Sequence, residues 1–406
     1  MPSKIVTLYA KMQLSGMPLK IVCDDRIPFI RGVFDPYADV LYLPGNEIDR
    51  AAVKDADALI VRTRTICNKS LLEGSKVKIV ASATIGYDHI DIAWCASAGI
   101  EWTNAPGCNS ASVQQYVVSV LCSLARRFNL NLCDLTLGVV GVGHVGSKVA
   151  AAAHALGMKV LLCDPPRARR EGPEQFVGLD ELVRHADIIT LHVPLSKEGP
   201  DATWHMFDSE RIASLSSHQI LINTSRGEVV DNKNLKNALK TGRIKASVLD
   251  VWENEPEIDG ELLDLLSIAT PHIAGYSADG KANGTAAVVR AVVSLLGLPL
   301  EDWQPESIPV APQGLSFSID AGEQSVQDVL CKAVFHAYDV LEDDSSLRHA
   351  PSYFEQLRGD YPVRRDFSAF NIKLNGGSAE MTSALKTLGF NLIWNDFERK
   401  LAKCPV

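Results

Sequence analysis

Short apolar runs recur along the N-terminal part of the chain, and stretches of helical length separate them. The first runs occupy residues 19–24, 58–62 and 78–81. Continuous runs of this kind are typical of strands that are buried on both faces, as in a parallel sheet covered by helices. Residues 112–128 carry apolar positions at helical spacing, and we expect this long helix to lead the chain into a second domain.

The same alternation continues after residue 136. The predicted strands there occupy residues 136–140, 159–163, 188–192, 219–223, 246–250 and 267–270. Strands that alternate with helices predict a doubly wound sheet, so the fold class is α/β with two Rossmann-like domains. Helical residues from Asp279 onward are expected to return to the first domain. The prolines at 305, 309 and 312 then mark a linker to a third unit.

Composition is that of an ordinary globular protein with more than one domain: 406 residues, 46% hydrophobic and 22% charged. The net charge of −9 argues against a nucleic-acid partner. No apolar run reaches the roughly 20 residues that cross a bilayer, so no membrane contact is expected. Residues 1–16 are interpreted as leader or added sequence. The nine cysteines include no Cys-x-x-Cys pair, which favours buried free thiols, no metal site and a cytoplasmic location.

A glycine motif directly after the strand at 136–140 indicates a dinucleotide site. Residues 141–146 read GVGHVG, in which Gly141 allows a tight turn, Gly143 lets a pyrophosphate approach the backbone and Gly146 permits close helix packing. The helix that follows offers free N–H groups and a positive dipole end to the phosphates. His144 and Val145 complete the motif and are expected beside the cofactor.

Asp164, at the end of the next predicted strand, favours NAD over NADP. An acid at this place can accept hydrogen bonds from the ribose hydroxyls and repel a 2′-phosphate. The alternative is that the basic run at 167–170 (RARR) receives a 2′-phosphate. We expect the prolines at 165 and 166 to turn the chain and carry these arginines to solvent.

An arginine, a glutamate and a histidine each follow a predicted strand of the second domain. Ligands of such folds bind at the carboxyl ends of the strands, so Arg226, Glu255 and His272 should lie along one edge. Arg226 can bind a carboxylate through its planar fork of donors, and His272 can take a hydroxyl proton as hydride leaves the same carbon. Glu255 can orient the histidine ring and stabilise the imidazolium.

Each of these three residues has a structural explanation when it is taken alone. A single histidine is more often structural, Arg226 can pair with a surface acid, and Glu255 can be an ordinary loop residue. Their occurrence together after a dinucleotide motif favours NAD-dependent oxidation of a small 2-hydroxy acid.

At these motifs the chain resembles the D-2-hydroxyacid dehydrogenase family. The glycine motif and the segments SRG (225–227), ENEP (253–256) and PHIAG (271–275) match that family in order and approximate spacing. The resemblance covers roughly residues 19–298. It implies that the arginine, glutamate and histidine of the family are Arg226, Glu255 and His272, with NAD as the cofactor.

Further segments resemble one branch of the family more closely: IVCDDRIPF, ATIGYDHID, APGCN, LLCDPP and the tail PSYFEQLRGDYPVRRDF. This resemblance implies oxidation of a phosphorylated hydroxy acid, 4-phospho-D-erythronate. It also implies a homodimer with three domains: a substrate domain (17–111 and 279–300), an NAD-binding domain (112–278) and a C-terminal α+β dimerisation domain (301–406).

The same resemblance assigns ligand contacts residue by residue. It implies substrate contacts at Thr63, Thr84 and Tyr276, and NAD contacts at Asp164, Val193, Asp250 and Gly275. The family has a serine at the position of Thr63, so the hydroxyl is kept in this chain. At the position of Val193 the family has a threonine. The second change matters little if the contact is through the backbone.

A substrate phosphate needs cations beyond Arg226. Arg62 and Arg64 flank Thr63, but alternation along a strand would place them on the face opposite Thr63 unless the strand has already ended. Arg364 and Arg365 in the tail are a second candidate pair, which reaches a neighbouring subunit's site or is simply a solvated pair. The rival functions are another dehydrogenase of the family, acting on phosphoglycerate, glycerate or lactate, and a non-enzymatic NAD-sensing module that binds proteins.

Overall fold

The computed structural model of the protein describes residues 18–393, and these form two units. The first unit takes residues 18–109 and 278–309, and the second takes residues 110–277 and 310–393. Residues 1–16, interpreted above as leader or added sequence, lie outside the described residues, as does Cys404.

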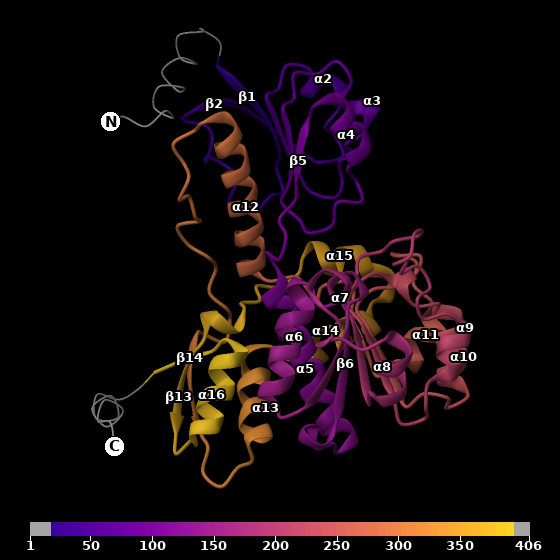
Figure 1. Ribbon diagram of the computed structural model, residues 1–406. Coiled ribbons are helices and arrows are strands. Elements are labelled where there is room, and N and C mark those ends of the chain that lie inside the picture. Colours follow the sequence, from indigo (N-terminus) through magenta and orange to yellow (C-terminus); the bar gives the residue numbers. More distant parts are fainter. Residues whose placement is uncertain (1–17, 394–406) are drawn as a thin grey trace. The chain divides into compact units, whose positions relative to one another are not determined.

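A parallel sheet in the order β2-β1-β3-β4-β5 forms the centre of the first unit (Figure 1). Its strands are β1 (Leu19–Asp24), β2 (Ala38–Leu43), β3 (Ala58–Val61), β4 (Ile79–Ser82) and β5 (Glu101–Thr103). The predicted strands β1, β3 and β4 are confirmed within one residue at each end. Strands β2 and β5 lie at the two edges and are only partly buried, so their sequences lack the continuous apolar run that revealed the others.

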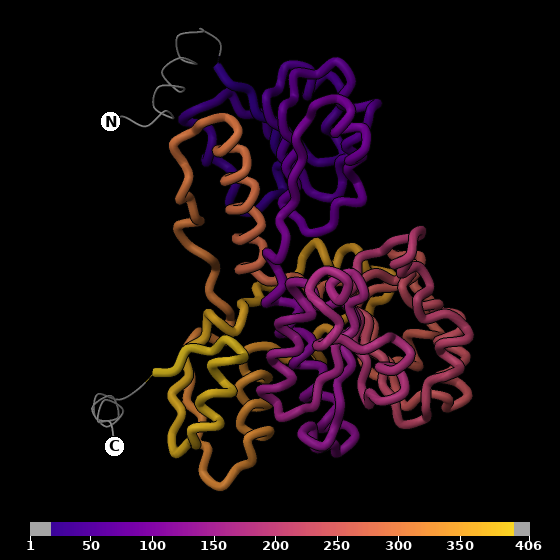
Figure 2. Tube along the Cα trace, viewed as in Figure 1, coloured from indigo at the N-terminus to yellow at the C-terminus, as the bar shows by residue number. Residues whose placement is uncertain are grey.

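The helices of the first unit over residues 18–109 and 278–309 are α2 (Arg50–Val53), α3 (Lys69–Leu72), α4 (Ile92–Ala98) and α12 (Ala278–Leu296). Turns, rather than a helix, connect β1 to β2. Helix α12 is distant in sequence but returns to the N-terminal strands, where Figure 2 shows it in orange beside the indigo chain. There Val289 and Val293 pack in one hydrophobic cluster with Ile21 and Ile60.

The second unit contains a parallel sheet in the order β11-β10-β9-β8-β6-β7. Its strands are β6 (Thr136–Val140), β7 (Lys159–Cys163), β8 (Ile188–Leu191), β9 (Ile220–Asn223), β10 (Ala246–Leu249) and β11 (Ile268–Ala269). The strand order reverses between β6 and β8, and ligands of doubly wound sheets bind at the carboxyl end of such a switch point. The glycine motif at 141–146 therefore follows the strand that borders the switch point.

Helices cover this sheet on both faces, as a doubly wound fold requires (Figure 1). They are α5 (Ser110–Phe128), α6 (His144–Ala155), α7 (Pro165–Glu171), α8 (Leu179–His185), α9 (Ser209–Ser214), α10 (Asn232–Lys240) and α11 (Gly260–Leu265), with 3₁₀ turns at η1 (Leu132–Asp134) and η2 (Gly227–Val229). The expected helix at 112–128 is confirmed as α5. Helix α6, expected after the glycine motif, begins inside it, at His144.

The C-terminal segment adds a small parallel sheet in the order β12-β13-β14. Its elements are β12 (Ser316–Asp320), α13 (Val326–Ala337), α14 (Val340–His349), η3 (Pro351–Tyr353), α15 (Phe354–Gly359), η4 (Phe367–Ala369), β13 (Asn371–Asn375), α16 (Ala379–Leu388) and β14 (Asn391–Leu392). Two doubly wound domains with an added C-terminal part confirm the predicted fold class.

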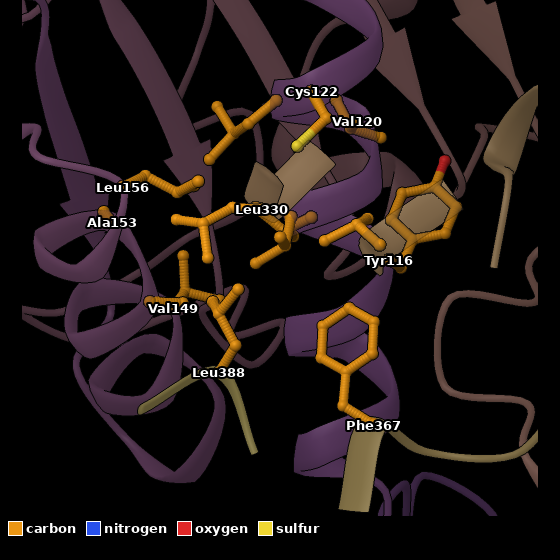
Figure 3. Packing of buried hydrophobic residues seen from close by; sticks show 14 of the residues in the cluster. Tyr116, Val120, Cys122, Val149, Ala153, Leu156, Leu330, Phe367 and Leu388 are labelled. Atoms are coloured by element: carbon orange, nitrogen blue, oxygen red, sulfur yellow. The ribbon is translucent and has the colours of Figure 1, made fainter. Parts of the chain in front are cut away.

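One hydrophobic cluster joins this C-terminal segment to the nucleotide-binding sheet. Figure 3 shows Leu330, Phe367 and Leu388 packed with Tyr116 of α5 and Val149 of α6. All five side chains are at most 3% exposed. The sequence predicts a separate third domain, whereas residues 310–393 share a unit and a core with residues 110–277. The role of this segment in dimerisation stays a prediction.

The eight described cysteines are all free. Burial raises the pKa of the Cys163 thiol to about 11 and that of Cys67 to about 12, so both are protonated at neutral pH. Cys133 is exposed, which differs from the expectation of buried thiols. Among residues 18–393, no helix combines the length and the apolar character needed to cross a lipid bilayer.

Because the core is shared, replacing a buried side chain of the C-terminal segment with a smaller one should destabilise the whole second unit. We expect Leu330→Ala to lower the free energy of unfolding by about 2–5 kcal/mol, because it opens a cavity between α5, α6 and α13. Urea unfolding followed by circular dichroism measures the change. Leu41→Ala is the control, since Leu41 is 45% exposed and its truncation should cost less than about 1 kcal/mol. Separate unfolding of the C-terminal segment, with the main transition unchanged, would contradict the shared core.

Candidate active site and dinucleotide site

Two of the three motif glycines are required by the turn after β6, and the other leaves space beside it. Gly141 has φ +84°, and a Cβ atom on it would lie 2.6 Å from the carbonyl oxygen of His192. A Cβ atom on Gly146 would lie 1.9 Å from the carbonyl oxygen of Gly141. A Cβ atom on Gly143 would meet nothing within 4 Å. The first and third glycines thus close the turn, while the second leaves open space above the backbone.

Helix α6 starts directly at this open space. Gly143 is its N-cap and supplies no side-chain cap, so the first N–H groups of the helix are available to a ligand. His144 and Val145 are the first two helical residues. The free N–H groups of the helix and the open space at Gly143 can accommodate a pyrophosphate. The site is therefore suited to a dinucleotide.

Asp164 holds the glycine turn in place. One carboxylate oxygen accepts a hydrogen bond from the Val142 amide at 2.8 Å, and the other accepts from the Arg167 amide at 2.9 Å and caps α7. The glycine turn, Asp164 and the start of α7 are consequently one rigid assembly, and the contact of Asp164 with the ribose stays a prediction.

Arg167 does not extend into solvent, which corrects the expectation for the basic run. Its guanidinium donates to the Val142 carbonyl oxygen through Nη1 and to the Glu171 carboxylate through Nε and Nη2. Arg169 and Arg170, by contrast, are 58% and 65% exposed. All three nitrogens of the Arg167 guanidinium already donate hydrogen bonds within the protein. This side chain is therefore poorly placed to bind a 2′-phosphate, in agreement with a site for NAD.

The end of β8 borders the same turn. Val193 lies against it, since a Cβ atom on Gly141 would approach the Val193 side chain to 2.9 Å. Burial lowers the pKa of the neighbouring His192 to about 3, so its ring is neutral. The Thr190 and Thr224 hydroxyls lie 3.0 and 3.3 Å from its two nitrogens. Sequence reasoning missed His192 because it ends an apolar run and belongs to no motif.

Glu255 and His272 form a hydrogen-bonded pair. His272 Nδ1 lies 2.8 Å from Glu255 Oε2, and Glu255 Oε1 accepts from the Trp252 amide at 2.8 Å. Burial raises the pKa of Glu255, but the bonds from His272 and Trp252 more than offset this, so that its pKa lies below the usual value. His272 is 32% exposed, and its Nε2 makes no hydrogen bond to the described residues. The pair can accept a proton at Nε2 while Glu255 stabilises the imidazolium.

Asp250 fixes the loop that carries His272. Its buried carboxylate accepts from the Thr270 hydroxyl and the Ile273 amide at 2.7 Å, and from the Ala274 amide at 2.9 Å. The His272 amide donates to the Asp250 carbonyl oxygen at 2.7 Å. These bonds hold His272 at φ +57°, a left-handed conformation that costs on the order of 1–3 kcal/mol outside such a frame. The contact of Asp250 with NAD stays a prediction.

The Arg226 loop packs directly against the loop that carries Glu255. A Cβ atom on Gly227 would lie 2.0 Å from the Trp252 carbonyl, so only glycine permits this approach. The Asn223 side-chain amide donates to the Arg226 carbonyl oxygen at 2.8 Å and anchors the loop to the end of β9. The structure thus joins the loops of Arg226, Glu255 and His272 through backbone contacts along adjacent strands.

The remaining predicted ligand residues fall in two places. Gly275 and Tyr276 directly follow the His272 loop, and Tyr276 packs edge-on against Tyr361 of the C-terminal segment. Thr63 and Thr84 belong to the first unit. Thr63 is exposed, whereas the Thr84 hydroxyl donates to the Gly86 carbonyl oxygen at 3.0 Å. Their substrate contacts stay predictions.

The candidate phosphate-binding arginines are placed as follows. Strand β3 ends at Val61, and Thr63 and Arg64 lie in a turn, so strand alternation does not separate them. Arg62 pairs with Asp24 through two hydrogen bonds.

The arginines of the tail are buried, at 5% exposure for Arg364 and 9% for Arg365. Arg364 donates to the Ala274 carbonyl oxygen at 2.6 Å, within the same chain. The prediction that Arg364 and Arg365 are a solvated pair is therefore wrong. Their contact with the site of a neighbouring subunit stays a hypothesis.

Comparison with protein families matches residues 112–274 to the D-isomer specific 2-hydroxyacid dehydrogenase NAD-binding domain, and residues 313–389 to a domain of unknown function. The erythronate-4-phosphate dehydrogenase of Bacteroides thetaiotaomicron is 48% identical over 87% of this chain and 99% of its own length. The protein of the same name from Escherichia coli O127:H6 is 44% identical over 92% of this chain and 99% of its own.

Two solved structures are similar in fold and carry NAD. The D-lactate dehydrogenase of Aquifex aeolicus, solved with NAD and lactic acid, has a TM-score of 0.59 and 28% identity over 70% of this chain and 97% of its own. The NAD-bound 3-phosphoglycerate dehydrogenase of Entamoeba histolytica has a TM-score of 0.59 and 26% identity over 72% of this chain and 100% of its own.

The glycine turn predicts that two alanine substitutions, three residues apart, act differently. Gly143→Ala should raise the Kd for NADH at least about tenfold, roughly 1.4 kcal/mol, because the methyl group fills the pyrophosphate space. Its thermal midpoint without NADH should fall only slightly, since nothing lies near the added atom and only the N-cap preference for glycine over alanine is lost. Gly146→Ala should lower that midpoint more. Fluorescence titration and thermal unfolding measure both, and wild-type NADH affinity in Gly143→Ala would argue against a pyrophosphate at Gly143.

Proposed function

Because the chain belongs to the erythronate-4-phosphate dehydrogenase family of D-2-hydroxyacid dehydrogenases, we propose that it oxidises 4-phospho-D-erythronate with NAD. The product is (R)-3-hydroxy-2-oxo-4-phosphooxybutanoate, and the reaction belongs to pyridoxal 5′-phosphate (vitamin B6) biosynthesis. The observation that carries this function is the 42–48% identity to erythronate-4-phosphate dehydrogenases over nearly their full length. The arrangement of the glycine turn and the Glu255–His272 pair supports the same chemistry.

The glycine turn and the edge of the nucleotide-binding sheet hold the cofactor. The α6 N-terminus at Gly143 and His144 binds the pyrophosphate, and Asp164 borders the ribose. Val193 and Gly275 line the remainder of the path from the glycine turn to the His272 loop. When bound there, NAD supplies the acceptor for the hydride that leaves C2 of the substrate.

The three catalytic side chains divide the remaining work. Arg226 binds the substrate carboxylate with its planar fork and orients C2. His272 Nε2 takes the proton of the C2 hydroxyl, and the Glu255 carboxylate, 2.8 Å from Nδ1, stabilises the charge that the ring acquires. Thr63, Thr84 and Tyr276 make the other substrate contacts in this proposal.

We further propose that the protein acts in the cytoplasm as a homodimer assembled through its C-terminal segment. The free thiols of the eight cysteines within residues 18–393 support a reducing compartment. The close sequence similarity of the C-terminal tail to the erythronate-4-phosphate branch supports the dimer.

A substrate panel tests the proposed function. We expect initial rates of NADH formation to favour 4-phospho-D-erythronate over 3-phospho-D-glycerate, D-glycerate and D-lactate by at least about a hundredfold in kcat/KM, near 2.7 kcal/mol. Preference for another acid would keep the fold, the cofactor and the catalytic residues but remove this reaction. Absence of turnover on every acid, with NADH binding intact and 2-oxo acids added to release it, would favour a protein-binding module.

The Glu255–His272 pair makes a second prediction. Glu255→Gln should reduce kcat and move the acid limb of the kcat/KM profile for oxidation to lower pH. Without the carboxylate the imidazolium is less stable, so the ring becomes a free base at lower pH. His272→Ala is the comparison: it should lose about 10²–10⁴-fold in kcat while NADH still binds. An acid limb that stays in place or moves upward in Glu255→Gln would refute the role given to this carboxylate.

A further inference from the structure

The C-terminal segment brings an arginine to the end of the catalytic loop. Arg358, on the short helix α15, lies 3.4 Å through Nη2 from the Tyr276 hydroxyl, and its guanidinium is 5.9 Å from the centre of the Tyr276 ring. Tyr276 stands four residues after His272 on the loop that Asp250 fixes. Arg358, Tyr276, Glu255 and His272 all belong to the second unit. A cation from outside the nucleotide-binding sheet is thus held beside the catalytic pair.

The protein provides hydrogen-bond acceptors for only some of the N–H donors of Arg358. A guanidinium has five N–H donors. Nη1 donates to Glu355 at 2.9 Å, Nη2 makes the long contact to Tyr276, and Nε is buried without a hydrogen-bond partner among the described residues. Buried donors are rarely left unpaired in folded proteins, and such cases call for a functional or structural explanation. An anionic ligand that engages the guanidinium would provide one.

Two other arginines of the same segment have structural roles instead. Arg348 donates to Asp344 and to the carbonyl oxygens of Leu263 and Leu266. Arg364 also has a buried Nε without a hydrogen-bond partner among the described residues, but it is 5% exposed, lies over the Tyr338 ring at 4.4 Å and donates to the Ala274 carbonyl oxygen, so it is enclosed by protein. The Arg358 side chain is 21% exposed, and its partner Glu355 is 40% exposed. A ligand anion can therefore replace Glu355 as the partner of Arg358 at little cost, because a partly exposed ion pair stabilises a protein by about 1 kcal/mol or less.

The charge of Arg358 also acts on the catalytic pair. Burial opposes ionisation of Glu255, but His272, the Trp252 amide and Arg358 together hold the pKa of this carboxylate below its usual value. Arg358 therefore lies within electrostatic range of Glu255. The Arg358 guanidinium thus neighbours both Tyr276, a predicted substrate contact, and the carboxylate of the catalytic pair.

We propose that Arg358 is a specificity-determining residue that binds the phosphate of the substrate. This rests on the proposed function, in which the substrate carries a phosphate at the end opposite its carboxylate. Arg226 then binds the carboxylate, and Arg358 binds the dianion with the planar fork that suits phosphate. The domain of unknown function at 313–389 thereby gains a role in substrate selection.

The test compares two acids that differ only in the phosphate, using the full-length chain. For Arg358→Gln we expect kcat/KM for 4-phospho-D-erythronate to fall about tenfold to a hundredfold, mainly through KM, because a charge-assisted hydrogen bond is lost. The rate with D-erythronate should change less than about threefold. Arg358→Lys should recover part of the loss, since it keeps the charge but not the fork. Lys332→Gln, on the exposed face of α13, removes an equal charge and should leave both rates unchanged.

Inhibition by inorganic phosphate separates this proposal from the proposed function. Phosphate should compete with whichever hydroxy acid the wild-type enzyme oxidises, and Arg358→Gln should raise its inhibition constant about tenfold or more. Equal losses for both acids in Arg358→Gln, or phosphate inhibition unchanged by it, would overturn the phosphate contact and leave Arg358 as a positioning residue for Tyr276. Preference of the wild type for an acid without phosphate would overturn the proposed function instead, and the inhibition constant would still decide the role of Arg358.

Discussion

The catalytic edge of the protein depends on one buried carboxylate. Asp250 directly follows β10 and accepts three hydrogen bonds from the loop that follows β11. Without those acceptors the Ile273 and Ala274 amides would be buried and unpaired, at a cost of about 1–3 kcal/mol each. His272 is also held in its left-handed conformation by this frame. The position of the base, and of Tyr276 after it, follows from a residue that needs no part in the chemistry.

The same frame extends outward through Thr270 and Ala274. The Thr270 hydroxyl is 2.7 Å from the Tyr116 hydroxyl on α5, and Arg364 donates to the Ala274 carbonyl oxygen. Helix α5 is buried nearly all round, and its polar side chains serve the C-terminal segment: Gln115 donates to the Arg365 carbonyl oxygen and Ser119 to that of Tyr338. Removing the C-terminal segment would therefore leave buried polar groups unpaired beside the catalytic loop. This explains why the segment shares a core with the nucleotide-binding sheet.

The sequence predicts those features that a single local pattern of residues determines. Buried parallel strands such as β6 and β7 need continuous apolar runs, and the turn after β6 needs glycine at Gly141 and Gly146, so the sequence predicts both within a few residues. The Glu255–His272 pair was predicted because each residue follows a strand of one sheet. The edge strands β2 and β5 were missed because partial burial relaxes their pattern.

Other features were hidden because they depend on tertiary contacts. Arg167 was expected in solvent, yet a capping bond to Asp164 and an ion pair with Glu171 turn it onto the glycine loop. Arg358 belongs to no motif of the nucleotide-binding domain. Its importance follows only from the folding of α15 against the loop of Tyr276, more than eighty residues earlier in the chain.

The catalytic loops themselves leave little room for specificity. Gly227 touches the Trp252 backbone, and Asp250 fixes the His272 loop, so none of these loops can be reshaped without loss of the pair they assemble. In the proposed function, Arg226 and His272 recognise the carboxylate and the hydroxyl, which every 2-hydroxy acid has. Discrimination must act on the part of the acid that extends beyond both groups. The proposed role of Arg358 meets that requirement, because a cation from a segment outside the sheet would add a contact to the distal end of the substrate and leave the catalytic frame intact.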